Sequence, residues 1–133
     1  HLFVKQNIAI AFESDYEPSF LERFISELPN QQFGINYDIG NSAASGFSAV
    51  EEIHAYGSRI LNVHIKDRIA NGPTIKLGRG AANFENVFSQ LKKCNYEGNF
   101  ILQTARAERG KHTEVLLIYK DFTLQLIREN GFL

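Results

Sequence analysis

The chain has 133 residues, 44% apolar and 22% charged, and its 14 basic and 15 acidic side chains leave a net charge of −1. This is the composition of one ordinary folded domain, residues 1–133, without an apolar run long enough to cross a membrane, and the interspersed charges argue against nucleic acid as a partner. The single cysteine, Cys94, excludes an internal disulfide and fits a reducing cytoplasm.

Four short apolar runs alternate with helix-like stretches along the chain. They are predicted as strands and comprise residues 8–12, 33–37, 60–65 and 100–102. Because a helix-like segment follows each strand and no hairpin dipeptide joins two of them, right-handed crossovers make all four strands parallel. The predicted fold is therefore α/β, a (β/α)4 unit. Since a closed eight-stranded barrel needs about 250 residues, a chain of 133 residues with four such units is expected to be a piece of something larger.

The first two helices are predicted from end signals and apolar spacing. Pro18 suits a first helical turn, and Pro29 stops that helix. Ser48 followed by Glu51 is a capping-box pattern, and Gly57 ends the second helix. One buried face is expected on each helix, formed by Phe20, Leu21, Phe24, Ile25 and Leu28 in the first and by Val50, Ile53 and Tyr56 in the second.

The last two helices are predicted at about 83–94 and 113–130. The final one carries a broad apolar face, from Leu116 to Ile127, that requires a partner surface. Four parallel strands also leave two open sheet edges, which natural proteins normally cover. The sequence therefore predicts that the unit pairs with another half or forms a homodimer.

Polar residues stand where each predicted strand ends. Glu13 follows the first strand, Asp38 the second and Gln103 the fourth, and His64 lies at the end of the third. Because parallel strands bring their carboxyl ends to one rim, these four side chains are predicted to share one site. Each also has a structural alternative: an acidic residue near a helix N-terminus for Glu13, a turn residue for Asp38 and a buried structural histidine for His64.

Three stretches carry a resemblance to a known family. They are Tyr37-Asp38-Ile39-Gly40-Asn41, Asn62-Val63-His64-Ile65-Lys66-Asp67, and Leu77-Gly78-Arg79-Gly80 with Asn83-Phe84 after it. In their order and spacing, residues 8–106 resemble the sugar phosphate isomerase/epimerase family of xylose isomerase-like TIM barrels. The resemblance implies the C-terminal half of that barrel, strands five to eight, and it implies that the missing half is the N-terminal half barrel. Ketose 3-epimerases and hexulose-phosphate isomerases belong to the same group, and abasic-site endonucleases are more distant relatives.

The resemblance also implies a divalent metal held by Glu13, Asp38, His64 and position 103. Carboxylate and imidazole ligands suit Mn²⁺, Mg²⁺, Co²⁺ or Zn²⁺. Glu13 is then the catalytic base that moves a proton next to a substrate carbonyl through an enediolate. Gln103 departs from the family pattern, because an amide stands where a second glutamate is expected. A neutral amide coordinates a metal weakly and cannot exchange a proton at pH 7.

The candidate substrate-binding residues are Asn41, Lys66, Asp67, Arg68 and Arg106. Arg106 lies three residues past Gln103 and suits a phosphate or a hydroxyl group. Residues 66–68 are alternatively a solvated charge run after a strand. His54 and His112 are predicted to be structural or surface residues.

The sequence thus favours a divalent-metal-dependent isomerase or epimerase of a sugar or sugar phosphate. The alternative is a catalytically silent sugar-binding or assembly module whose site is degenerate at Gln103. An abasic-site endonuclease is disfavoured, because the chain has no basic face for a nucleic-acid backbone.

Overall fold

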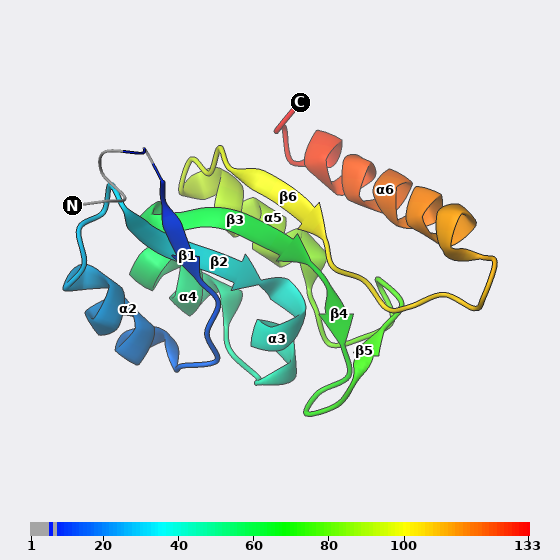
Figure 1. Ribbon diagram of the computed structural model, residues 1–133, viewed down its shortest axis with the longest axis horizontal. Helices are drawn as coiled ribbons and strands as arrows, with labels where there is room; N and C mark the ends of the chain where they lie inside the picture. The colour runs from blue at the N-terminus through cyan, green and yellow to red at the C-terminus, as the bar shows by residue number, and fades with distance from the viewer. Residues whose placement is uncertain (1–5, 7) are drawn as a thin grey trace.

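The computed structural model describes Gln6 and residues 8–133, which form a four-stranded parallel sheet with helices packed against it (Figure 1). The strands β1 (Ile10–Phe12), β2 (Phe33–Asp38), β3 (Ile60–Ile65) and β6 (Asn99–Leu102) lie in the order β1-β2-β3-β6. All three pairings are parallel. The predicted α/β fold with parallel strands is therefore confirmed.

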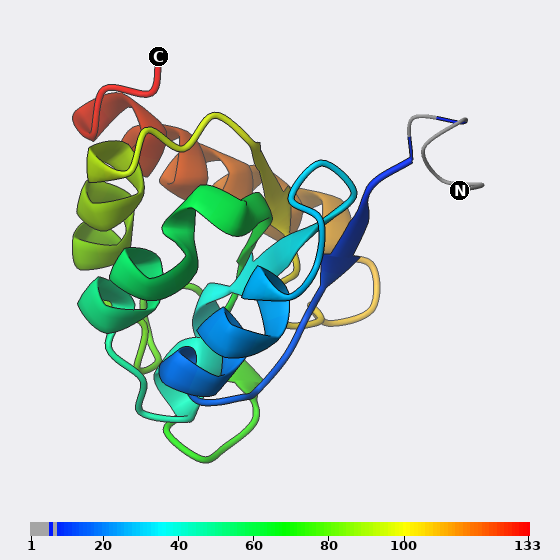
Figure 2. The same cartoon turned by 90° about the vertical axis from the view of Figure 1, so that its left-hand side faces the viewer.

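The main helices are α2 (Pro18–Ser26), α4 (Ala49–Tyr56), α5 (Phe84–Lys93) and α6 (His112–Glu129). Figure 2 shows them gathered to one side of the sheet, and α6 packs beside α5. Pro18 stands at the start of α2, as predicted, because its missing N–H costs no hydrogen bond in the first turn. None of the helices in the described part of the chain is long and apolar enough to span a bilayer.

The core lies between the helices and one face of the sheet. Alternate strand residues such as Ile35, Tyr37, Val63 and Ile65 are buried there against the helices, together with Leu21, Ile25, Ile53, Phe88 and Leu91. Because side chains alternate along a strand, the residues between them point to the opposite face. That opposite face is left open by the described helices (Figure 1).

Two of the predicted buried helix faces are narrower than expected. Val50 is 47% exposed, so its assignment to the core is wrong. Phe20 and Phe24 are also exposed, and only Leu21 and Ile25 of α2 are buried. Phe20 packs against the ring of Tyr16 and Phe24 against the ring of Phe12, and these contacts leave both residues partly exposed. Ser48 stands at the N-cap of α4 but makes no capping hydrogen bond through its side chain.

Three small elements were not predicted. A one-and-a-half-turn helix, α3 (Ile39–Ala44), follows β2 directly, and a 3-10 turn (Gly57–Arg59) extends α4. The loop after β3 contains a short antiparallel hairpin of β4 (Asp67–Arg68) and β5 (Thr74–Ile75). These segments are too short to show a periodic apolar pattern. α3 and the hairpin both border the carboxyl ends of the strands, where the polar residues meet (Figure 1).

Candidate metal centre

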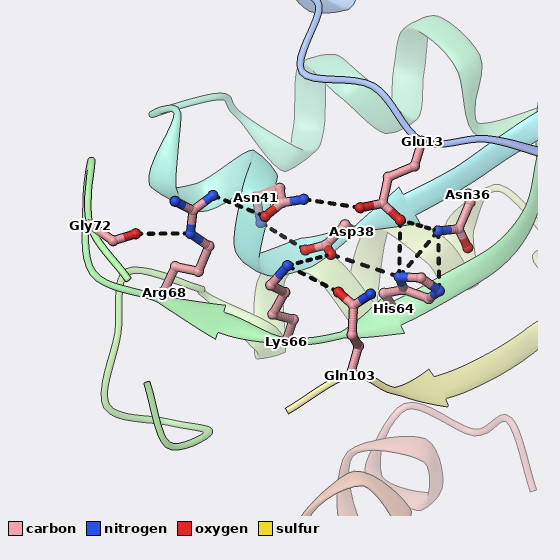
Figure 3. A network of polar contacts seen from close by, with 9 residues as sticks. All are labelled: Glu13, Asn36, Asp38, Asn41, His64, Lys66, Arg68, Gly72 and Gln103. Carbon is pink, nitrogen blue, oxygen red and sulfur yellow. Dashed lines mark hydrogen bonds and ion pairs between the residues drawn. The ribbon is translucent and has the colours of Figure 1, made fainter. Parts of the chain in front are cut away.

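Polar side chains from all four strands gather at the carboxyl rim of the sheet (Figure 3). Asp38 is the last residue of β2 and pairs in register with His64 on β3. Glu13 and Gln103 immediately follow β1 and β6, respectively, and their side chains reach the same region. The parallel arrangement of the strands is what brings these residues, distant in sequence, to one place.

Three of these side chains form a tight cluster. One ligand atom from each of Glu13, Asp38 and His64 lies within 4.8 Å of the others. Nδ1 of His64 is 3.2 Å from Oε2 of Glu13 and 3.7 Å from Oδ2 of Asp38. Bonds of about 2.0–2.2 Å to a common metal separate neighbouring ligand atoms by about 3–4 Å. The two distances from His64 and the mixed oxygen and nitrogen donors therefore fit a divalent cation.

Two asparagines hold the Glu13 carboxylate. Nδ2 of Asn36 donates to Oε2 of Glu13 at 2.7 Å, and Nδ2 of Asn41 donates to Oε1 at 3.1 Å. The Asn36 amide nitrogen is also 3.2 Å from both ring nitrogens of His64. Both oxygens of Glu13 are thus directed by amide donors from β2 and α3. Such contacts behind a metal ligand fix its orientation.

Asn36 was missed by the sequence reasoning, although a signal was present. Polar Asn36 and Asp38 alternate with buried Ile35 and Tyr37, so the two polar side chains lie on the open face. Asn36 is 8% exposed, and its Oδ1 is buried without a hydrogen-bond donor among the described residues. If the Asn36 amide were reversed, its oxygen would lie 2.7 Å from Oε2 of Glu13, and two acceptors would face each other. The amide is therefore better placed with its nitrogen toward Glu13, although its oxygen then has no donor among the described residues.

The two carboxylate oxygens of Asp38 make different contacts. Oδ1 accepts from the backbone N–H of Asn41 at 2.8 Å and so caps α3. Oδ2 lies 3.2 Å from Nζ of Lys66 and faces His64. The turn role predicted as an alternative for Asp38 therefore coexists with its place in the cluster.

Lys66 connects Gln103 to this cluster. Its Nζ donates to Oδ2 of Asp38 at 3.2 Å and to Oε1 of Gln103 at 3.0 Å. Arg68 lies farther along the same rim, where Nη1 donates to Oδ1 of Asn41 at 3.0 Å. One hydrogen-bonded network therefore joins the cluster of Glu13, Asp38 and His64 to four more of the predicted residues (Figure 3). These four are Asn41, Lys66, Arg68 and Gln103.

The remaining two predicted substrate residues lie elsewhere. Asp67 is fully buried, and its carboxylate accepts hydrogen bonds from the backbone N–H groups of Arg79, Gly80 and Ala82. It holds the 77–82 loop in place, which corrects its assignment to substrate binding. Arg106 is exposed and lines a cavity of about 280 Å³ with Lys76 and Lys111. No direct contact joins it to the cluster among the described residues.

Another carboxylate, that of Glu52, is buried on the helix side of the rim. Glu52 on α4 accepts hydrogen bonds from the hydroxyls of Tyr37 at 2.9 Å, Tyr56 at 2.8 Å and Ser42. Burial raises the pKa of the Glu52 carboxyl, and the three hydroxyl donors partly oppose that rise. Burial and the nearby Glu52 charge also raise the pKa of Tyr37. Glu52 was not predicted, because its partners come from three separate elements.

A family model described as a xylose isomerase-like TIM barrel matches residues 5–120 of this chain. A Haemophilus influenzae protein, provisionally named an L-ribulose-5-phosphate 3-epimerase, is 33% identical over 108 residues, which cover 76% of this chain and 38% of that protein.

Two solved structures share the fold. A xylose isomerase domain protein from Planctomyces limnophilus superposes with a TM-score of 0.79 at 20% identity, over 94% of this chain and 49% of that chain. A protein solved with a bound zinc atom superposes with a TM-score of 0.70 at 18% identity, over 86% of this chain and 44% of that chain. The chain thus spans less than half the length of these relatives.

Proposed function

Since this chain belongs to the family of xylose isomerase-like TIM barrels, as its motifs predicted, we propose that it is the metal-holding part of a sugar or sugar phosphate isomerase or epimerase. The observation that carries this proposal is the cluster of Glu13, Asp38 and His64 at the carboxyl rim. The provisional name of the Haemophilus influenzae relative supports a ketose phosphate as substrate. The chain spans less than half the length of the relatives named above, so the catalytic activity of a complete barrel is proposed here for this chain.

Glu13, Asp38 and His64 are the proposed metal ligands, and Gln103 is a neutral fourth candidate. The zinc atom in one structural neighbour supports a divalent metal in this fold, and the oxygen-rich donor set also suits Mn²⁺, Mg²⁺ or Co²⁺. When bound, the metal polarises a substrate carbonyl and so acidifies the neighbouring C–H group.

Glu13 is the proposed base for that C–H proton. Its side chain is 37% exposed, so that a substrate on the open face can reach it, whereas the Asp38 side chain is 2% exposed. The amides of Asn36 and Asn41 hold the carboxylate in one orientation, which is the positioning that proton transfer requires. Asn41, Lys66 and Arg68 are the proposed contacts for the substrate oxygens, because all three lie in the hydrogen-bonded network at the rim.

The proposal predicts that Glu13→Gln loses proton exchange. With Mn²⁺ added, the wild-type chain should exchange a carbon-bound proton of one member of a panel of ketoses and ketose phosphates with heavy water, measured by nuclear magnetic resonance. Glu13→Gln should slow this exchange by about 10²- to 10⁴-fold, because a positioned base contributes that much. Removal of the metal by a chelator should abolish the exchange.

Glu22→Gln is the matched control, since Glu22 lies exposed on α2 and should leave the exchange unchanged. Wild-type chain that binds Mn²⁺ but exchanges no carbon-bound proton across the panel would contradict the enzyme proposal. That outcome would favour the second candidate, a catalytically silent sugar-binding module. This alternative is supported by the neutral Gln103, which stands where the family resemblance implies a second carboxylate.

A further inference from the structure

Lys66 is built firmly into the rim of the sheet. Its side chain is 15% exposed, and its ammonium lies between Asp38 and Gln103 at 3.2 and 3.0 Å. Gly40 makes this placement possible, because a Cβ on Gly40 would lie 2.8 Å from Cγ of Lys66 and 2.9 Å from its carbonyl carbon. The stem of Lys66 therefore packs directly against the backbone of α3, and its ammonium is delivered to the edge of the metal cluster (Figure 3).

Gln103 changes what this ammonium can do. A carboxylate at position 103 would hold Lys66 between two negative charges, whereas the amide leaves Asp38 as the only carboxylate in contact with it among the described residues. An ammonium has three N–H donors, and two of them are accounted for by Asp38 and Gln103. No acceptor among the described residues takes the third N–H, which can therefore meet a substrate oxygen.

The charges of the cluster also favour the binding of an anionic substrate oxygen. Glu13 and Asp38 contribute two negative charges and Lys66 one positive charge, and a metal-binding His64 is neutral, so a divalent cation would bring the site to a net charge of +1. A site of this sign stabilises an anionic oxygen in preference to a neutral hydroxyl. The enediolate oxygen formed in the proposed reaction is such an anion.

We propose that Lys66 binds the substrate oxygen that becomes negative when Glu13 removes the carbon-bound proton. This inference rests on the proposed proton transfer. The C–H bond breaks as its proton joins the Glu13 carboxylate, and its electron pair forms the carbon–carbon double bond of the enediolate while the carbonyl electrons move to the oxygen. Lys66 donates a hydrogen bond to that oxygen and keeps its own proton. Glu13 returns the proton to the neighbouring carbon, and the hydroxyl proton passes between the two adjacent oxygens.

The test uses glycolohydroxamate, a planar anionic mimic of an enediolate, and isothermal titration of the Mn²⁺-loaded chain. Lys66→Met should weaken hydroxamate binding by about tenfold or more, the loss expected for one charge-assisted hydrogen bond. The same variant should bind Mn²⁺ itself about fivefold more tightly, since a positive charge beside Asp38 has been removed. A lysine that only packs against α3, and whose charge has no effect on the site, would not shift the two affinities in opposite directions. Lys93→Met, an exposed lysine of α5, should change neither.

Gln103→Glu tests the inference without removing the lysine. The new carboxylate should draw Lys66 into an ion pair and weaken hydroxamate binding, while it tightens Mn²⁺ binding. Unchanged hydroxamate affinity in either variant, with Mn²⁺ bound, would overturn the role of Lys66 and leave the proposed metal site intact. A wild-type chain that binds no Mn²⁺ would instead overturn the proposed function, and the role of Lys66 with it.

Discussion

Asn36 supports the metal ligands while one of its own atoms stays unsatisfied. Its Nδ2 directs Glu13 and lies beside His64, whereas its buried Oδ1 has no donor among the described residues. An unsatisfied buried acceptor costs about 1–3 kcal/mol, comparable to the gain from the hydrogen bond that Nδ2 makes to a carboxylate. Residues that favour function over stability in this way are typical of sites that bind a ligand.

Asn36→Leu should therefore separate metal affinity from stability. Loss of the amide that orients Glu13 should weaken Mn²⁺ binding by about 10- to 100-fold, the usual effect of removing a group behind a metal ligand. The free energy of unfolding should change by less than about 1 kcal/mol, because the lost hydrogen bond and the removed orphaned oxygen offset one another. Titration with Mn²⁺ and urea unfolding of the metal-free chain measure the two quantities.

Asn62→Leu provides the comparison for that variant. Asn62 is the register partner of Asn36 on the neighbouring strand and lies on the same face of the sheet. It makes no hydrogen bond to the cluster among the described residues, so its substitution should leave the Mn²⁺ affinity unchanged. Equal losses in both variants would show that any leucine on this face disturbs the site, and would contradict a specific role for Asn36.

At the scale of elements, Glu52 ties three of them together behind the rim. Its carboxylate accepts from Tyr37 on β2, Ser42 on α3 and Tyr56 on α4. These bonds hold α3 and α4 against the strand that ends in Asp38. Because burial raises the pKa of Glu52 in the folded chain, the folded state binds its proton more tightly than the unfolded state does.

This raised pKa predicts how Glu52 affects stability as the pH changes. The stabilising contribution of protonated Glu52 is complete below the ordinary glutamate pKa of about 4.3 and is lost as the pH rises through the higher folded value. Glu52→Gln should abolish that part of the pH dependence, so the stability of the wild type relative to this variant should fall as the pH rises above that ordinary value. Urea unfolding at a series of pH values measures the difference.

Glu51→Gln is the control for this series, since Glu51 precedes Glu52 on α4 and is exposed. Its stability relative to the wild type should vary far less with pH. A difference between wild type and Glu52→Gln that stays constant with pH, or grows as the pH rises, would contradict a raised pKa for Glu52.

The elements with a repeated pattern were predictable from the sequence. Apolar runs and helical spacing locate the four parallel strands and the four main helices, and strand ends locate Glu13, Asp38 and His64. The 67–75 hairpin and α3 carry no such pattern, because they are held by contacts with distant residues. Exposed Val50 fits the apolar spacing of α4, yet no partner surface reaches it. The spacing of apolar residues shows which helix face can be buried. Whether that face is buried depends on the elements that pack next to it.

For the whole molecule, the main consequence of the fold is the sheet face that the described helices leave open (Figure 2). This face carries the metal cluster at its carboxyl rim, and β6 contributes Ile101, which is 40% exposed. An exposed sheet face and open strand edges favour association with another surface. Both predicted partners, another half of a barrel and a second copy, would cover the same face.

In a solution of this chain alone, a second copy is the available partner, so we expect concentration-dependent self-association through the open face. Ile101→Lys should shift the chain toward the monomer in sedimentation velocity, because a charge would have to be buried at the contact. Its circular dichroism spectrum should not change, since Ile101 already faces solvent. Val50→Lys places the same charge on the exposed side of α4 and should leave the association unchanged. A chain that stays monomeric at high concentration, or an equal effect of both substitutions, would contradict association through the open face.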